Sequence, residues 1–166
     1  GDGSFGAAAF NQPITVGMDL VESAARRART IPHYRHVIVG DVRRLPFRTC
    51  SLRSVVSNGV LEHVPGITAG MEEIARVVQS GGCLALTVPG ERCGGADRVR
   101  RGERVSPWES MINRLWNHAN LHAPEWWNQP AGTWVIEEIR PYLGPRSYRT
   151  LLLFFWLGGP WAILVR

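Results

Sequence analysis

Two neighbouring stretches decide the fold: GDVRRLPF at residues 40–47 and SNGVLEHV at residues 57–64. Each follows a short apolar run, HVIVG at 36–40 and SVVS at 54–57, and each places polar side chains directly after that run. A short apolar run bounded by turn residues is typical of a buried strand. Polar groups after successive strands indicate a sheet that binds a ligand at its carboxyl edge.

The same alternation of apolar runs with helical patterns continues on both sides, which predicts βαβ units and a mostly parallel sheet. The predicted strands are 14–19, 36–40, 54–57, 83–88 and 133–139. The predicted helices are 4–10, 21–29, 67–78 and 111–120. Gly81 and Gly82 are expected to stop the helix over 67–78. The continuous apolar run CLALTV predicts that the strand over 83–88 is buried on both faces.

The chain begins with GDGSFG at residues 1–6, which has the spacing G-x-G-x-x-G. Glycines let the backbone turn sharply into a helix and approach a ligand closely. Asp19 ends the next predicted strand, where a carboxylate can accept hydrogen bonds from both hydroxyls of a ribose. It can equally cap the helix that starts near Val21. This region predicts an adenosine-containing cofactor and leaves its kind open.

The two deciding stretches resemble class I S-adenosylmethionine-dependent methyltransferases, in the broad group with the pattern GD…LPF…VVSN.VLEHV. The matching residues are Gly40, Asp41, Leu45, Pro46, Phe47, Ser57, Asn58, Leu61, Glu62, His63 and Val64, followed by Gly81 and Gly82. These motifs cover about residues 1–90. The resemblance implies a Rossmann-like three-layer α/β/α sandwich with a mostly parallel sheet. It also implies S-adenosyl-L-methionine as cofactor and methyl transfer as the reaction.

The resemblance further implies which residues bind the cofactor. In the family, the acid after the third strand binds the adenine amino group; here it would be Asp41, with the Val42 amide reaching a ring nitrogen. Asp2 would repel a pyrophosphate but can face an ammonium group, which favours S-adenosylmethionine over a dinucleotide. The expected cofactor-binding residues are Gly1, Asp2, Gly3, Asp19, Leu20, Asp41, Val42 and Asn58.

One departure from the family concerns its first strand. That strand carries its own acid and the first glycine of the loop, and it has no counterpart after Gly1. In the family it lies in the centre of the sheet. We therefore expect a fragment that lacks its first strand, with a gap between strands and a reduced cofactor site.

The acceptor side is less clear from the sequence. Methyl transfer needs mainly an aligned nucleophile, and a base is required only for a poor one. His63 is the candidate base, with packing against a loop as the alternative. Glu62, His122 and Trp126 are candidate contacts to the acceptor. Glu62 could instead hold His63 or simply face solvent, and tryptophans are more often part of a core. The acceptor could be a hydroxyl, an amine, a carbon acid or a lipid-like molecule.

The 166 residues suffice for one ordinary domain. We expect a methyltransferase domain over 1–150 and a hydrophobic segment over 151–166. The apolar run 151–165 is shorter than the roughly 20 residues of a bilayer span and is interrupted by GGP at 158–160. It predicts a helix on the sheet, an interfacial anchor or the start of a span. The expected location is cytoplasmic, with peripheral membrane contact as the alternative.

The net charge of +5 comes from nineteen basic residues that are all arginine. A chain with arginine alone indicates genome base composition rather than a nucleic-acid patch, which would usually mix both basic residues and interleave aromatics, so no nucleic-acid partner is expected. The densest cluster, Arg98, Arg100, Arg101 and Arg104, predicts a solvated loop.

Three cysteines without a C-x-x-C spacing indicate reduced thiols, and no metal site is expected. A chain without lysine cannot supply the Tyr-x-x-x-Lys pair that one kind of nicotinamide-dependent oxidoreductase needs. An oxidoreductase therefore remains a less favoured alternative. The other alternative is a catalytically inactive methyltransferase-like binding module.

Overall fold

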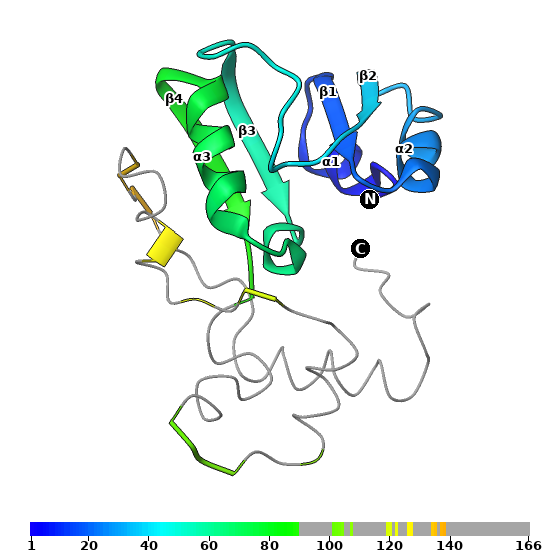
Figure 1. Ribbon diagram of the computed structural model, residues 1–166. Helices are drawn as coiled ribbons and strands as arrows, with labels where there is room; N and C mark the ends of the chain where they lie inside the picture. Colours follow the sequence, from blue (N-terminus) through cyan, green and yellow to red (C-terminus); the bar gives the residue numbers. More distant parts are fainter. Residues whose placement is uncertain are drawn as a thin grey trace. The chain divides into compact units, whose positions relative to one another are not determined.

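The computed structural model describes residues 1–89, 101–104, 107, 119–120, 122, 126–127, 134–135 and 137–138. Residues 1–135 form one compact unit and residues 136–166 a second. The first unit contains the following elements (Figure 1): α1 Ser4–Ala9, β1 Ile14–Asp19, α2 Glu22–Ala28, β2 Tyr34–Val39, β3 Leu52–Asn58, the 3-10 helix η1 Leu61–His63, α3 Ile67–Val77 and β4 Val78–Thr87.

The predicted alternation of strands and helices is confirmed over this part of the chain. The strand predicted at 14–19 coincides with β1, and the helices predicted at 4–10 and 21–29 enclose α1 and α2. Strand β2 begins two residues before its prediction, at Tyr34, and β3 extends beyond its predicted range at both ends. These shifts are of the size that fraying and pairing produce at element ends.

The strands form two parallel pairs. β1 pairs with β2, with Asp19 opposite Val39, and β3 pairs with β4, with Asn58 opposite Thr87. Within the described residues no strand pairing joins the two pairs, so the predicted sheet is two two-stranded sheets. Because paired parallel strands end at one edge, the residues that follow them lie together.

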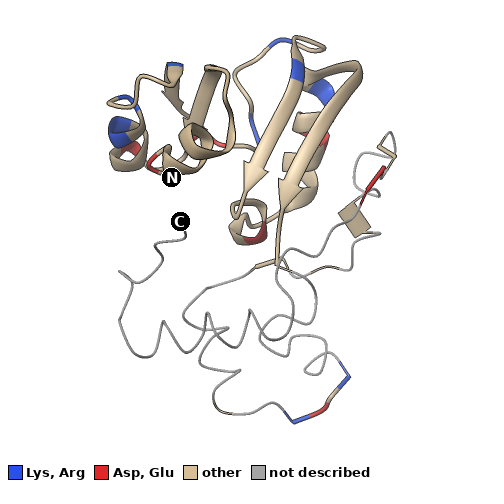
Figure 2. Cartoon of the chain, turned by 180° about the vertical axis from the view of Figure 1, so that it is seen from behind, with Lys and Arg blue, Asp and Glu red and all other residues tan. Residues whose placement is uncertain are grey.

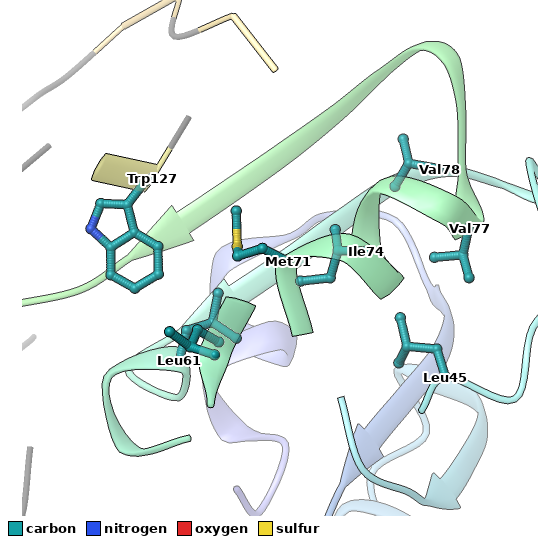
Figure 3. Packing of buried hydrophobic residues seen from close by; sticks show 8 residues of the cluster. Leu45, Leu61, Met71, Ile74, Val77, Val78 and Trp127 are labelled. Carbon is teal, nitrogen blue, oxygen red and sulfur yellow. The ribbon is translucent and has the colours of Figure 1, made fainter. Parts of the chain in front are cut away.

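The larger core lies between α3 and the β3–β4 pair. The side chains of Leu61, Met71, Ile74 and Val77 are at most 1% exposed, and Trp127 packs with them from much later in the chain (Figure 3). The helix α3 presents these residues on one face, with the spacing of an amphipathic helix. Across the β1–β2 pair, α2 buries only small side chains, those of Ala24, Ala25 and Ala28.

The expectation that Gly81 and Gly82 stop the preceding helix is wrong. α3 ends at Val77, and β4 starts at the next residue because Val78 already has extended backbone angles. The two glycines lie inside β4, where the pairing moves from Leu52 opposite Val78 to Ser54 opposite Cys83. Gly81 has a φ of 72°, so this irregular stretch of the ladder uses the left-handed backbone that glycine permits.

The expectation of a strand buried on both faces is also wrong. Cys83 and Ala85 are exposed, whereas Leu84 and Leu86 pack against the core cluster. In the described part of the molecule, α3 covers one face of the β3–β4 pair, so apolar side chains alternate between core and solvent.

The strand predicted over 133–139 is not formed where the structure describes it. Trp134, Val135, Glu137 and Glu138 have no strand pairing, and Val135 is 83% exposed. The β-branched and aromatic composition gives a strand tendency, but a strand also needs a neighbour to pair with. Trp134 instead packs its side chain against the core cluster.

Several predictions fall outside the described residues, namely most of the helix at 111–120, most of the loop at 90–107 and the apolar run at 151–165. Among the helices that the structure describes, none has the length and apolar character to cross a bilayer. Arginines in the described part are spread over α2, the loop after β2, β3 and α3 (Figure 2). Of the arginine cluster, Arg101 is exposed and pairs with Glu103 at 2.7 Å. Cys50 and Cys83 are free thiols, as expected.

Candidate functional site

The glycine loop turns into α1 at Gly3. This residue has a φ of 88° and is the N-cap of the helix. The carboxylate of Asp2 accepts a hydrogen bond from the Ser4 amide at 3.0 Å. That bond, together with one from the Ser4 hydroxyl, holds the pKa of Asp2 below its usual value. Asp2 therefore stays ionised and exposed at the loop, where it could face a cationic group.

Tyr34 in β2 is a site-building residue that sequence reasoning missed. Its hydroxyl donates a hydrogen bond to the Gly3 carbonyl at 2.9 Å. A Cβ on Gly3 would lie 2.9 Å from its ring, and one on Gly6 would overlap its hydroxyl. The glycine spacing thus serves close packing onto a neighbouring strand, and only the tertiary structure reveals the tyrosine.

Asp19 lies at the end of β1, as predicted. Its Oδ1 accepts a hydrogen bond from the Val21 amide at 2.7 Å, and its Oδ2 accepts one from the amino group of Gly1. The helix α2 has Val21 as its N-cap and no side-chain cap, so Asp19 shapes the turn before the helix. Leu20 follows with its side chain 64% exposed.

Asp41 lies just beyond β2, at the edge it shares with Asp19. The Gly40 amide donates to the Asp19 carbonyl at 3.0 Å, which joins the two strand ends. Both carboxylate oxygens of Asp41 contact the guanidinium of Arg43, at 2.6 Å for Oδ2 to Nη2 and 3.1 Å for Oδ1 to Nε. The hydrogen bonds from the Arg43 side chain and amide lower the pKa of Asp41.

Two contacts connect the Asp41 loop to the other half of the site. Arg43 Nη1 donates to the carbonyl of Pro65 at 3.3 Å, in the turn between η1 and α3. The half-buried Val42 packs against the core cluster, and a Cβ on Gly70 of α3 would lie 3.4 Å from Val42 Cγ1. Residues at the ends of both strand pairs are thereby brought into one region of the unit.

The LPF segment at 45–47 is held by two residues of α3. Arg76 donates to the carbonyls of Leu45 and Phe47 at 3.1 and 2.9 Å, and Glu73 accepts from the Leu45 amide at 2.7 Å. Glu73 and Arg76 also pair with each other at 2.6 Å. This clamp positions the segment that follows Asp41, so it supports the site without contacting a ligand.

Asn58 ends β3, and its side chain is tied to β4. The Thr87 hydroxyl donates to Asn58 Oδ1 at 2.6 Å, and the Gly59 amide donates to the Thr87 carbonyl at 3.1 Å. Gly59 turns the chain with a φ of 59°. The carboxyl ends of β3 and β4 are thus joined as those of β1 and β2 are.

The turn η1 contains the two candidate acceptor-side residues Glu62 and His63. Glu62 is 4% exposed, and its Oε2 has no hydrogen-bond partner. Burial raises the pKa of this carboxyl. His63 is 43% exposed, and its Nε2 lies 3.8 Å from Glu62 Oε1, beyond hydrogen-bond distance. The prediction that Glu62 could simply face solvent is therefore wrong.

A distant segment docks onto this turn. The amides of Ala119 and Asn120 donate to the Glu62 carbonyl at 2.7 and 2.9 Å. The side-chain amide of Asn120 donates to the carbonyls of Leu61 at 3.0 Å and Val64 at 2.7 Å. Asn120 is a functional residue that sequence reasoning missed, because an asparagine in a polar stretch carries no signal of its partner.

The aromatic residues after Asn120 come with this segment. The rings of His122 and Trp126 are stacked, with centroids 3.6 Å apart, and Trp127 meets Trp126 edge-on at 5.1 Å. Trp127 is 6% exposed and belongs to the core cluster with Leu61, with its ring nitrogen turned away from Met71 and Leu61 (Figure 3). Trp126 packs against the core cluster that contains Leu61. Contact of His122 and Trp126 with an acceptor stays a prediction.

Asp19 is placed to bind the ribose of an adenosine-type cofactor, whereas Asp41, the expected adenine-binding residue, is already paired with Arg43. Asp19 lies at the carboxyl end of β1, where a carboxylate can accept hydrogen bonds from ribose hydroxyls. Asp41 is at the neighbouring strand end, but its oxygens are engaged by Arg43, so an adenine amino group would share them. Within the described residues no group of three metal-ligating side chains occurs.

Comparisons with known proteins agree with the architecture. The family model described as a methyltransferase domain matches residues 1–86. A chain in the complex of the Haloferax volcanii Trm112 methyltransferase activator with a protein described as a methyltransferase has a TM-score of 0.58. Its identity is 18%, and the match covers 80% of this chain and 55% of that one. No curated protein sequence matches the chain.

Two further solved structures show the same likeness. The PH0226 protein of Pyrococcus horikoshii OT3 has a TM-score of 0.58 at 20% identity, with 87% of this chain and 74% of that chain covered. Geranyl diphosphate C-methyltransferase of Streptomyces coelicolor A3(2), solved with S-adenosyl-L-homocysteine, has a TM-score of 0.52 at 19% identity, with 78% and 46% covered. The Rossmann-like α/β fold is confirmed. The chain spans about half the length of the structures matched first, 55%, 53% and 50% of their chains.

Proposed function

The chain belongs to the methyltransferase domain family, and on that premise we propose that it uses S-adenosyl-L-methionine to methylate a small-molecule or lipid-like acceptor. The observation that carries the proposal is the pair of acids, Asp19 and Asp41, at the joined ends of β1 and β2 beside the glycine loop. When bound, the cofactor supplies a methyl group that its sulfonium already activates for displacement.

The cofactor side uses residues on both strand pairs. Gly1, Asp2 and Gly3 take the amino-acid part of the cofactor, with Asp2 facing its ammonium group. Asp19 binds the ribose hydroxyls and Leu20 covers the sugar. Asp41 and the Val42 amide bind the adenine, with Arg43 keeping Asp41 ionised. Asn58 closes the site from the end of β3.

The acceptor side lies at η1. Glu62, His122 and Trp126 contact the acceptor, and His63 removes a proton where the nucleophile needs it. The exposure of His63 allows exchange of that proton with solvent. Peripheral contact of residues 151–165 with a membrane would suit a lipid-like acceptor. With these roles, the methyl group of the cofactor would lie between the carboxyl ends of the two strand pairs. The sulfonium already activates the methyl group, so the protein needs only to align the acceptor's nucleophile for in-line attack.

Calorimetric titration of the chain with S-adenosyl-L-homocysteine and with NADH tests the proposal. We expect S-adenosyl-L-homocysteine to bind and NADH to fail. Asp19→Ala removes the ribose acceptor and should weaken binding by about tenfold or more. The matched control is Glu22→Ala, an exposed acid of α2 that should leave binding unchanged. Selective NADH binding, or S-adenosyl-L-homocysteine binding that survives Asp19→Ala, would contradict the proposal.

A further inference from the structure

The side chain of Glu62 is buried without a hydrogen-bond partner for one of its oxygens. Glu62 and Asn120 are the buried polar residues of the described part, and the Asn120 side chain donates to two carbonyls. Glu62 Oε2 has no hydrogen-bond partner, and His63 Nε2 lies 3.8 Å from Oε1. A buried carboxyl in this state is destabilising, and natural proteins retain such groups where they have a use.

The carboxyl group of Glu62 is not needed to hold the η1 turn in place. The backbone carbonyl of Glu62 receives the amides of Ala119 and Asn120, and the Asn120 side chain fastens the carbonyls on both sides. These bonds involve main-chain atoms of η1, so they would persist with another residue at position 62. The carboxyl group is therefore held in a rigid turn but takes no part in building it.

The surroundings of the turn are aromatic. The stacked pair His122 and Trp126 follows Asn120 by a few residues, and Trp127 packs in the same cluster as Leu61. The ring nitrogens of Trp127 and Trp134, which both contact that cluster, are also buried without an acceptor. The stacked rings lie on the segment whose Ala119 and Asn120 amides bind the Glu62 carbonyl. An acidic group and aromatic rings held by the same turn favour a positively charged ligand, because ring faces attract cations and a carboxylate neutralises them.

We propose that Glu62 is the anchoring group for an amine, and that the methyl acceptor is a small molecule bearing a protonated amino group next to an apolar or aromatic body. The ammonium group binds Glu62 Oε2, and the body lies along His122 and Trp126. Before transfer the ammonium gives a proton to His63, whose Nε2 lies 3.8 Å from Glu62 Oε1; the freed lone pair attacks the methyl carbon as its bond to sulfur breaks. A hydroxyl or carbon acid brings no positive charge to Glu62, which would then have only His63, at 3.8 Å, as a cationic neighbour among the described residues. This assignment rests on the proposed function and narrows its acceptor to amines.

Ligand binding to the full chain tests the assignment without requiring turnover. The probe is 2-phenylethylamine, and its neutral match is 2-phenylethanol, which has the same body without the charge. Tryptophan fluorescence reports binding because Trp126 and Trp127 lie at the turn. We expect the amine to bind at least about tenfold more tightly than the alcohol. Glu62→Gln should remove this preference, whereas Glu72→Gln, an exposed acid of α3, should keep it.

The outcomes separate this inference from the proposed function. Glu62-dependent preference for the amine supports the inference, whether or not S-adenosyl-L-homocysteine binds in the parallel calorimetric titration. Equal binding of amine and alcohol by the unaltered chain, binding of neither, or a preference that survives Glu62→Gln overturns it. S-adenosyl-L-homocysteine binding in those cases would leave the proposed function standing. Because the amine–alcohol comparison uses the unaltered chain, equal binding or binding of neither overturns the inference even if the variant fails to fold.

Discussion

The ring of Tyr34 lies against three glycines, Gly3, Gly6 and Gly17, with no room for a Cβ on any of them. A glycine motif at the start of a chain is usually explained by a ligand. Here two of its glycines also have a packing role, because the tyrosine hydroxyl must reach the Gly3 carbonyl. Close approach of a ligand and close packing of a strand both require a residue without a Cβ at these positions.

Gly6→Ala tests the packing role. The new methyl group would overlap Tyr34 Oη and approach Ile14 Cδ1 to 2.6 Å, so we expect a loss of about 1–3 kcal/mol in the free energy of unfolding. Urea denaturation measures it. Gly1→Ala, which meets nothing within 4 Å, is the control and should be neutral. A double variant with Tyr34→Ala should lose less than the sum of the single variants; full additivity would count against the overlap.

Glu62 gives a pH-dependent prediction. Burial raises its pKa in the folded state, so both states are protonated below its unfolded value of about 4.3 and no difference arises there. As the pH rises through the folded pKa, ionisation of the buried carboxyl destabilises the fold. Glu62→Gln should therefore stabilise the chain at neutral pH and have little effect near pH 4. Thermal unfolding at both pH values measures this, and an equal effect at both would refute it.

At the scale of residues, the sequence was enough to predict the acidic residues at the strand ends. It was not enough to predict the residues that form hydrogen bonds with the site after folding. Asp19 and Asp41 could be predicted because a polar residue directly after an apolar run marks a strand end. Tyr34, Arg43 and Asn120 could not, because each acts on a group that is brought near by folding. The position of Glu62 could be predicted, but its burial depends on a segment almost sixty residues later.

The helix α3 shows how an element acts beyond its own packing. Its apolar face fills the core, while Glu73 and Arg76 on another face hold the LPF segment. The ion pair is partly exposed, with 34% of the Arg76 side chain accessible, so its direct electrostatic contribution is small. Its effect comes from the hydrogen bonds that the guanidinium donates to the main-chain carbonyls of Leu45 and Phe47.

Arg76→Ala should loosen the segment that it clamps. We expect the Leu45 amide, which donates to Glu73, to exchange hydrogen at least about tenfold faster. In the unaltered chain, local opening of this segment must also break the hydrogen bonds from Arg76 to Leu45 and Phe47, and in the variant these bonds are absent. Arg26→Ala in α2 is the matched control, since Arg26 pairs with Glu22 in the same helical manner but is 70% exposed and holds no loop. Unchanged Leu45 exchange in Arg76→Ala would show that the clamp is dispensable.

At the scale of elements, the predicted helices and strands were correct where the apolar pattern was long. The predictions were wrong where they relied on a pair of glycines or on strand composition alone. Gly81 and Gly82 looked like a helix stop, but the helix ended earlier and the glycines entered a ladder irregularity. The stretch around Trp134 has a strand composition without a strand partner. Pairing depends on neighbours, and a single sequence does not show which neighbours are present.

The described molecule has two halves with unequal cores. The β1–β2 pair is covered by alanines of α2, whereas the β3–β4 pair has a cluster of Leu61, Met71, Ile74 and Val77. Buried apolar area is the main favourable term in folding, so these halves differ in local stability. The predicted fold class was correct. The sequence did not predict that the strands divide into two sheets, and this division is what leads us to expect a difference in local stability between the halves.

Native-state hydrogen exchange measures this difference. We expect amides in the middle of β2, at Val37 and Ile38, to exchange about tenfold or more faster than those at Val55 in β3 and Leu84 in β4. Both sets lie in parallel ladders, so the comparison isolates the core behind each pair. Equal protection would mean that the halves open together as one cooperative unit.

The contacts of Asn120 also order events in time. Its side chain joins carbonyls that lie 59 and 56 residues earlier, at Leu61 and Val64. Closing so long a segment is slow compared with forming the β1–α2–β2 region, whose partners are near in sequence. During synthesis the η1 turn stays without these bonds until residue 120 has left the ribosome. The β1–α2–β2 region can thus form before the η1 turn gains its bonds from Asn120.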